Sequence, residues 1–296
     1  MLVIVGYLVV ILTVFGGYGL SGGHFGVLYQ PLELLIIGGA GVGAFIVGNN
    51  GKAIKATMKS VPHLMKGSSY NKALYMDLIG AMYLLLNKSR QSGMISLEND
   101  IEDPQNSPIF SAYPRLLKDS VLMNFILDYL RLMVSGNMSA FEVEALMDEE
   151  IETCEHEHEV PASSITQVGD ALPAFGIVAA VMGVVNALAS ADRPAAEMGE
   201  LIAHAMVGTF LGILLAYGFI SPLAALLRQK SSEQIKMLQC IKITLLSSLH
   251  GYAPQIAVEF GRKILYTTER PTFIELEDHV RQVKSSSTNS ASDSSS

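Results

Sequence analysis

Residues 200–227 read ELIAHAMVGTFLGILLAYGFISPLAALL, and this stretch restricts the possible folds of the chain more than any other. It is long enough to cross a bilayer, and it has no Lys, Arg, Asp or Glu after its first residue. Thr209 and Tyr217 nevertheless place hydroxyl groups inside it, and Pro222 removes a backbone donor. A lipid anchor needs none of these groups, whereas a helix packed against other helices around a polar path uses all of them.

Three more apolar segments, at 2–20, 32–48 and 169–190, complete two pairs joined by the short linkers 21–31 and 191–199. We therefore predict an all-α polytopic membrane protein with four transmembrane helices and a helical cytoplasmic domain. The expected division is residues 1–48 for transmembrane helices 1 and 2, 49–168 for the cytoplasmic helical domain, 169–227 for transmembrane helices 3 and 4, 228–284 for cytoplasmic C-terminal helices, and 285–296 for a Ser-rich disordered tail.

The basic residues predict the orientation. Of 20 Lys and Arg residues, ten lie in 49–168 and nine in 228–296, and only Arg193 lies in a short linker. The positive-inside rule places both long regions in the cytoplasm, so we expect an inner-membrane protein with both termini inside. The net charge of −8 argues against a nucleic-acid partner.

Helical periodicity marks five cytoplasmic helices, at 70–90, 116–133, 139–159, 232–249 and 271–283. Ser139 and Glu142 form a capping box at the start of the third. Cys154 and His158 have the spacing of a metal pair, but only one helix contributes, so we expect no metal and no cofactor. The sequence has no phosphate loop, nucleophile elbow or Ser/His/Asp arrangement, so we do not expect an enzyme.

The centres of the four apolar segments contain no carboxylate. Glu33 lies at the outer end of the second segment, Asp170 at the inner end of the third, and Glu200 with His204 at the outer end of the fourth. A proton path through a bilayer normally contains a buried acid. Either this chain conducts nothing, or a partner supplies that acid.

Counting residues from the ends of the third and fourth segments places four other residues at two depths in the membrane. Ala180 and Thr209 each lie ten residues from the outer end of their segment, near the midplane. Pro173 and Pro222 lie near the inner ends, where they predict a hinge at one level or a local fit of each helix.

Small residues predict close helix contacts. In each of three segments such residues share one helix face. They are Gly39 and Gly43 in the second segment, Gly176, Ala180 and Gly183 in the third, and Gly208, Gly212 and Ala216 in the fourth. Three such faces favour a tight bundle or an oligomer.

The fourth segment also carries a family resemblance. The run Ala205-Met206-x-Gly208-Thr209-Phe210-x-Gly212-x-Leu214, followed by Pro222, resembles the signature of the MotA/TolQ/ExbB proton-channel family. Six further runs resemble its MotA-like members, the stator proteins of the bacterial flagellar motor: GYLVV at 6–10, VFGGY at 14–18, FIVGNNGKAIK at 45–55, LMDEEIET at 146–153, LPAFGIVAAVMGVV at 172–185 and FGRK at 260–263. The resemblance extends from residue 1 to about residue 284 and includes the long loop after the second segment, whereas TolQ and ExbB have three spans.

The resemblance implies a partner and an ion. MotA-like proteins form a homo-oligomeric ring around a pair of MotB chains, and each MotB brings the aspartate that binds the proton. Thr209 matches the family's threonine near that aspartate, so it is a candidate path-lining residue together with Ala180. Sodium-driven relatives tend to have a hydroxyl at the position of Ala180, and an alanine offers no oxygen ligand to sodium. We therefore expect proton drive.

The resemblance also implies how force reaches the rotor. Pro173 and Pro222 match two prolines that couple protonation to movement of the cytoplasmic domain. Arg90 and Glu98 match two charged residues that engage the rotor protein FliG. In this sequence they flank a turn that ends one helix, and Ser96 is expected to cap the next. Glu150 matches a family acid and is a possible inner-mouth acid.

The sequence thus favours a subunit of a proton-driven flagellar stator that converts proton flow into torque. Two alternatives stay open. One is a related TolQ/ExbB-like energiser of outer-membrane processes, and the other is a self-contained ion channel or transporter.

Overall fold

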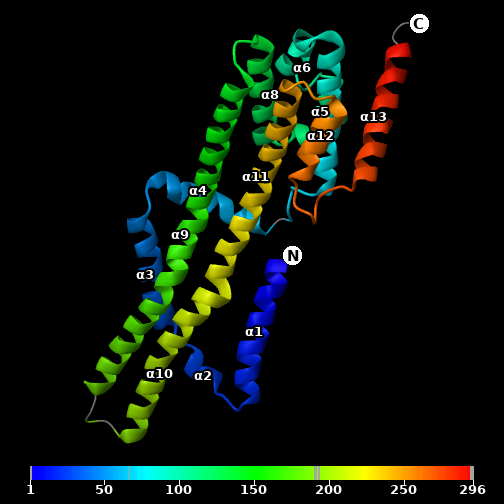
Figure 1. The fold of residues 1–296 in the computed structure, drawn as a ribbon. Coiled ribbons are helices and arrows are strands. Elements are labelled where there is room, and N and C mark those ends of the chain that lie inside the picture. The colour runs from blue at the N-terminus through cyan, green and yellow to red at the C-terminus, as the bar shows by residue number, and fades with distance from the viewer. Residues whose placement is uncertain (1, 66, 190–191, 193, 294–296) are drawn as a thin grey trace. The chain divides into compact units, whose positions relative to one another are not determined.

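The computed structural model describes residues 2–65, 67–189, 192 and 194–293 (Figure 1). Throughout these residues the secondary structure is helical, with no strand. The chain forms two units, the first from residues 1–67 and 156–231, and the second from residues 68–155 and 232–296. Two long helices, α9 (Ala140–Leu188) and α11 (Ser221–Leu249), contribute residues to both units.

The first unit contains the membrane helices. Helices α1 (Leu2–Leu20), α2 (Phe25–Leu28), α3 (Pro31–Gly48) and α4 (Gly51–Leu64) precede its part of α9. Helix α10 (Ala195–Ile213) then leads through the π-helix η3 (Leu214–Ile220) into α11. Four helical stretches are long and apolar enough to cross a membrane: Leu2–Leu20, Phe25–Gly48, Ala140–Leu188 and Ala195–Leu249. The predicted all-α fold with four spans is confirmed.

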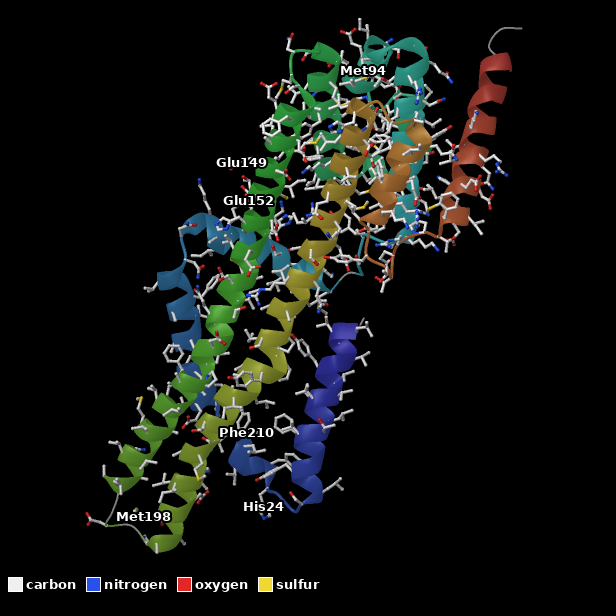
Figure 2. The ribbon with its side chains drawn as sticks, in the orientation of Figure 1. His24, Met94, Glu149, Glu152, Met198 and Phe210 are labelled. Carbon is white, nitrogen blue, oxygen red and sulfur yellow. The ribbon has the colours of Figure 1, made fainter. Side chains whose placement is uncertain are left out.

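A small apolar core holds α3, α9 and α10 together. Its buried residues are Ile37, Leu172, Ala179, Val207, Leu211 and Ala216. Helix α1 has no buried residue, but Tyr7 Oη donates to the Phe219 carbonyl at 2.9 Å. Phe210, labelled in Figure 2, extends from α10 on the side of α1, and its ring lies edge-on to that of Phe15 with centroids 6.3 Å apart. Aromatic contacts therefore attach α1 to the rest of the unit.

The second unit is a helical domain around α5 (Lys72–Ser92). It continues with η1 (Met94–Leu97), α6 (Glu98–Glu102), η2 (Phe110–Ala112), α7 (Pro114–Leu117) and α8 (Ser120–Ser135), and later with α12 (Pro254–Lys263) and α13 (Phe273–Asp293). Its core is much larger than that of the first unit, and the largest side chains that it fully buries are Tyr75, Tyr129, Phe110 and Phe125. The second unit therefore has an apolar core of its own.

Side-chain caps fix the starts of α9 and α8. The capping box forms as expected: the Ser139 N–H donates to Glu142 Oε2 at 2.7 Å, and the Glu142 N–H donates to Ser139 Oγ at 3.3 Å. Asp119 accepts from the N–H groups of Val121 and Leu122 to cap α8. The bonds that the Glu142 carboxylate accepts lower its pKa, with the bond from the Ser139 backbone as the largest cause.

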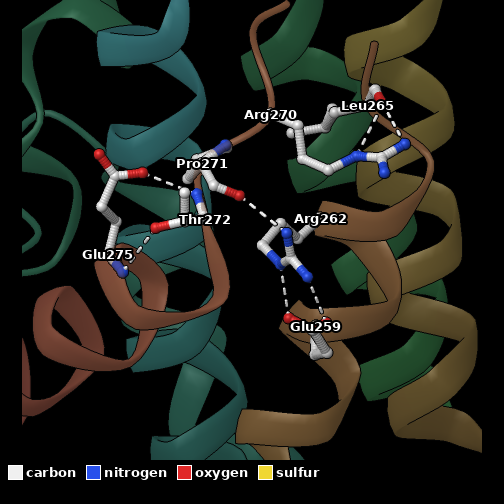
Figure 3. A network of polar contacts seen from close by, with 7 residues as sticks. All are labelled: Glu259, Arg262, Leu265, Arg270, Pro271, Thr272 and Glu275. Atoms are coloured by element: carbon white, nitrogen blue, oxygen red, sulfur yellow. Dashed lines mark hydrogen bonds and ion pairs between the residues drawn. The ribbon is translucent and has the colours of Figure 1, made fainter. Parts of the chain in front are cut away.

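Polar contacts also shape the connection between α12 and α13 (Figure 3). Arg262 is only 5% exposed, and its guanidinium donates to both oxygens of Glu259 at 2.6 Å and to the Pro271 carbonyl at 2.7 Å. Arg270 donates to the Leu265 carbonyl at 2.7 Å. The turn between the two helices is therefore held by charge-assisted bonds to main-chain carbonyls.

Some helix boundaries differ from the expectation. The helix expected to end near residue 159 continues as α9 to Leu188, with Pro161 and Pro173 inside it. A proline removes its own N–H and crowds the carbonyl of the preceding turn, but packing against neighbouring helices allows a helix to continue through it. Helices α4 and α12 were not predicted, although Pro254 at the first position of α12 is a recognisable start signal.

The domain boundaries and the tail stay predictions. Residues 49–67 and 156–168 belong to the same unit as the membrane helices. Helix α13 extends through Asp293 into the segment 285–296, for which the composition predicts disorder, and residues 294–296 lie outside the described residues.

Candidate functional site

The third and fourth spans meet with their backbones in contact. A Cβ built on Gly212 of α10 would lie 2.7 Å from the Leu172 carbonyl oxygen and 2.9 Å from the Gly176 Cα of α9. A Cβ built on Gly176 would lie 2.8 Å from the Gly208 carbonyl oxygen. Only glycine fits at such a crossing. The close contact predicted for the third and fourth segments is therefore confirmed.

The small-residue face of the second span is different. Gly39 and Gly43 of α3 are exposed, and a Cβ built on either would meet no atom within 4 Å in the described chain. Gly41 points inward instead, where its Cβ would lie 3.1 Å from Leu172 Cδ2. The face with Gly39 and Gly43 is thus left open within one copy of the chain.

The two predicted path-lining residues lie at the crossing of α9 and α10. A Cβ on Gly208 would lie 3.2 Å from the Ala180 nitrogen, and a Cβ on Gly176 would lie 3.3 Å from the Thr209 Cα. Ala180 and Thr209 are both partly exposed. The structure therefore brings Ala180 and Thr209 to one region of the first unit and leaves each accessible from outside the chain.

The two prolines differ in their surroundings. Pro173 lies inside continuous α9, whereas Pro222 follows η3, in which the Ser221 N–H donates to the Ala216 carbonyl five residues back. Pro222 has no N–H to donate to the backbone hydrogen bonds of the helix. In the π-helix before it, these bonds connect residues five apart instead of four. Pro222 therefore does not break the fourth span, which runs on into α11.

The prolines are also not at one level. Leu172, next to Pro173, packs on Gly212, whereas Ser221, next to Pro222, packs on Gly169. Gly169 and Pro173 are one helical turn apart on α9, which corresponds to about 6 Å. The expected single level is therefore corrected: Pro222 lies nearer the inner end of α9 than Pro173 does.

Glu33 reaches further into the first unit than its position in the sequence suggests. It is the third residue of α3, yet its Oε2 atom is buried and has no hydrogen-bond partner. A Cβ built on Gly208 of α10 would overlap this oxygen, and a Cβ built on Gly183 of α9 would lie 3.6 Å from Oε1. Two glycines from two helices make room for one carboxyl group.

Arg90 and Glu98 lie on the second unit and flank a turn, as predicted. Both are exposed, Arg90 in the last turn of α5 and Glu98 at the start of α6. Gly93, with φ of 83°, ends α5. The expected cap by Ser96 is wrong: its Oγ donates to the Gly93 carbonyl at 2.6 Å, because η1 fills the space between the two helices.

An acid that was not singled out from the sequence fixes this turn. Asp100 is 1% exposed, and it accepts from Lys88 Nζ at 2.6 Å and from Ser107 Oγ at 2.6 Å. Lys88 belongs to α5 and Asp100 to α6, so the pair connects the two helices that carry Arg90 and Glu98. The partners are twelve residues apart, and no sequence pattern marks them.

A cleft of about 380 Å³ opens beside Arg90. The residues around it are mostly apolar: Leu86, Met94, Met133, Leu249, Tyr252 and Pro254. Ser89 and Ser248 also line the cleft, and Arg90 is its charged residue, so this surface offers one cation beside a hollow of mixed polarity.

Glu150 has a structural contact in the second unit. Its Oε2 accepts a hydrogen bond at 2.7 Å from the hydroxyl of Tyr129, which is 1% exposed. Burial of Tyr129, and then this bond, raise the pKa of the phenol. The role of Glu150 as an inner-mouth acid stays a prediction.

The candidate metal pair finds no third ligand. Across the part of the chain that the structure describes, no group of three or more His, Cys, Asp and Glu side chains could hold a metal ion. Cys154 packs against the apolar core of the second unit. His158 has a buried Nδ1, and its burial lowers the pKa of the imidazole.

Known proteins resemble this chain over nearly its whole length. Residues 4–93 match the family model described as Motility protein A N-terminal, and residues 117–240 match the MotA/TolQ/ExbB proton channel family. Motility protein A of Salmonella typhimurium is 72% identical over 284 residues, which cover 96% of each chain.

Two solved structures have a similar fold. The flagellar MotAB stator complex from Bacillus subtilis contains a chain that is 29% identical, with a TM-score of 0.71, and the match covers 86% of this chain and 92% of that one. A chain in the structure of C. jejuni MotAB has a TM-score of 0.76 at 21% identity, with coverage of 92% and 98%, respectively, and supports the fold. The chain is therefore a multi-pass membrane protein that belongs to the motility protein A family and carries the domain of the MotA/TolQ/ExbB proton channel family.

Proposed function

We propose that this chain is a subunit of the proton-driven flagellar stator, which forms a proton path with MotB and converts proton flow into torque on the rotor. The observation that carries the proposal is its 72% identity to a motility protein A over 96% of both chains. The crossing of α9 and α10 supports it, because it gathers Ala180 and Thr209 in one accessible region.

The proposed setting is the bacterial inner membrane, with both termini in the cytoplasm. The distribution of Lys and Arg supports this orientation. We further propose that several copies of this chain form a ring around MotB. The open face of α3 with Gly39 and Gly43, and the uncovered α1, leave apolar surface for neighbouring copies or lipid.

The proton step uses an acid from MotB near Thr209. A proton from outside neutralises this buried carboxylate, which removes an unfavourable charge and changes the forces on α9 and α10. Since the two helices touch through backbone atoms, one cannot shift without the other. Pro173 and Pro222 are the proposed points at which the shift is passed on.

The output is a charged contact with the rotor protein FliG. Arg90 and Glu98 are exposed on a turn that the Lys88–Asp100 pair holds rigid. Exposed charges steer encounter and allow fast release, which suits a stepping contact. One elementary charge moving through 100 mV supplies about 2.3 kcal/mol, so each step is small or uses several protons.

The ion is tested with the complete stator. In cells whose only stator is this chain with MotB, swimming speed is expected to fall with a protonophore and to stay constant when sodium is replaced by potassium. The reason is that Ala180 offers no oxygen ligand to sodium. Speed that follows sodium instead contradicts the role of Ala180, and ion flux into vesicles that contain this chain without MotB supports a self-contained channel.

The rotor contact is tested by charge reversal. Arg90→Glu and Glu98→Lys are each expected to reduce the swimming rate, while the level of the chain in the membrane and the proton flux stay unchanged. The matched control is Arg281→Glu, an arginine on α13 whose side chain is 73% exposed. Normal motility in both reversal variants would exclude this surface as the rotor contact.

A further inference from the structure

We propose that Glu33 is a proton-binding group of this chain, which takes protons from the outer side and passes them to the acid of the partner. This inference rests on the proposed function, because it assigns a step of the same proton path. It differs from the expectation that the partner brings the only acid within the spans.

The geometry places the carboxyl group of Glu33 between two helices. Its Oε2 lies against Gly208 of α10, where any side chain would overlap it, and its Oε1 lies near Gly183 of α9. The Oε2 atom is buried and has no hydrogen-bond partner. The carboxyl group is therefore directed at glycines on two neighbouring helices, and only its Oε1 side remains open.

This position is at the level of the path-lining residues. A Cβ on Gly208 that overlaps Glu33 Oε2 would also lie 3.2 Å from the Ala180 nitrogen, and Gly208 directly precedes Thr209. The α-carbon of Glu33 is at the outer end of α3, but its side chain carries the acid inward. The chain therefore has its own carboxyl group beside the crossing.

The surroundings make a permanent charge there unfavourable. The nearby core of the first unit is apolar, with Ile37, Ala179 and Val207 among its buried members. An unpaired carboxylate whose oxygen is buried in such surroundings is unfavourable, because it loses its hydration without gaining a partner. A group in this position alternates between a neutral acid and a transient anion that is quickly reprotonated.

Titratable neighbours exist on one side. On α10, His204 and Glu200 lie one and two turns before Gly208, toward the outer end, with His204 Nε2 at 3.9 Å from Glu200 Oε1. Residues 171–188 of α9, all of α2 and the rest of α3 contain no titratable side chain, and α1 offers only Tyr7 and Tyr18. His24 lies in the linker after α1. The proposed entry of protons to Glu33 is therefore from the outer side, where Glu200 and His204 lie on the same helix as Gly208.

The proton balance is simple. The carboxylate of Glu33 takes one proton from the outer water and becomes a neutral acid. It then releases this proton to the carboxylate of the partner, directly or through water, and returns to the anion. One proton moves inward for each cycle, and no other reactant is consumed.

The first test is proton uptake by vesicles that contain the complex of this chain with MotB, driven by a pH gradient over a series of outer pH values. Glu33→Gln is expected to slow uptake about 100-fold, the lower end of what a positioned acid–base group contributes, and to flatten its pH profile. Glu33→Asp is expected to keep a pH-dependent flux at a lower rate. Asp192→Asn, an exposed acid of the outer linker, is the control and should match the unchanged protein.

The second test measures the protonation state of the Glu33 carboxyl group in the unchanged complex. It therefore does not depend on the folding of a variant. A hydrophobic carbodiimide adds to a protonated carboxyl group in apolar surroundings, and mass spectrometry locates the adduct. Labelling of Glu33 is expected to decline as pH rises and to block uptake.

The outcomes separate the two proposals. An unchanged complex that conducts no protons contradicts the proposed function. A complex that conducts normally, with Glu33→Gln at the same rate and pH profile, overturns only the role of Glu33. Absence of the carbodiimide adduct at every pH also overturns the role of Glu33. This test decides the question even if the Glu33→Gln variant fails to assemble.

Discussion

Gly212→Val is expected to abolish motility and to prevent stable packing of the third and fourth spans. Any Cβ at this position would lie 2.7 Å from the Leu172 carbonyl oxygen and 2.9 Å from the Gly176 Cα. These are main-chain atoms of a continuous helix, so they cannot rotate away as a side chain would. Overpacking of a core costs about 1–3 kcal/mol, and backbone contacts place this substitution at or above the upper limit.

The measurement is the melting temperature and yield of the complex with MotB in detergent. Gly212→Ala should show a smaller loss of the same kind. Gly199→Val, near the start of the same helix α10, is the control, because a Cβ there would meet no atom within 4 Å in the described chain. A Gly212→Val complex that melts at the unchanged temperature would show that α9 and α10 do not cross at these glycines.

Arg262→Ala is expected to destabilise the second unit by about 3–5 kcal/mol, the range for removing one partner of a buried ion pair. The variant leaves Glu259, whose side chain is 22% exposed, without its counter-ion and the Pro271 carbonyl without its donor. Both losses fall on the turn between α12 and α13 (Figure 3). We therefore expect α13 to become the first segment that a protease releases.

The matched control is Arg281→Ala. Arg281 also pairs with a glutamate on its own helix, Glu277 at 3.1 Å, but its side chain is 73% exposed. Exposed pairs of this kind contribute about 0–1 kcal/mol. Denaturant midpoints and proteolysis rates of the two variants are compared in the full-length chain, and equal effects would mean that burial of Arg262 adds nothing.

The sequence predicts the large elements of this structure because their signals are local. A run of apolar residues as long as 2–20 indicates a span by length alone, and the capping box at Ser139 and Glu142 fixes a helix start within four residues. Helix ends were less predictable. A proline such as Pro161 usually indicates an end, but α9 continues through it because tertiary contacts outweigh the lost bond.

The site was predicted in part for a related reason. Ala180 and Thr209 could be paired by counting residues from the outer ends, since depth along a straight helix is proportional to residue number. Glu33 and Asp100 escaped this reasoning because their significance depends on where a side chain reaches. The carboxyl of Glu33 extends to another helix, and Asp100 meets Lys88 across a turn.

The π-helix η3 has one further consequence. A π-helical turn holds more residues than an α-helical turn, so η3 accommodates an extra residue. If the bonding became α-helical, this residue would lengthen the helix along its axis. A return of Leu214–Ile220 to α-helical bonding would advance α11 by about 1.5 Å and rotate it by about 100° relative to α10. The π-helix thus sets the size and direction that such a change in the fourth span would have.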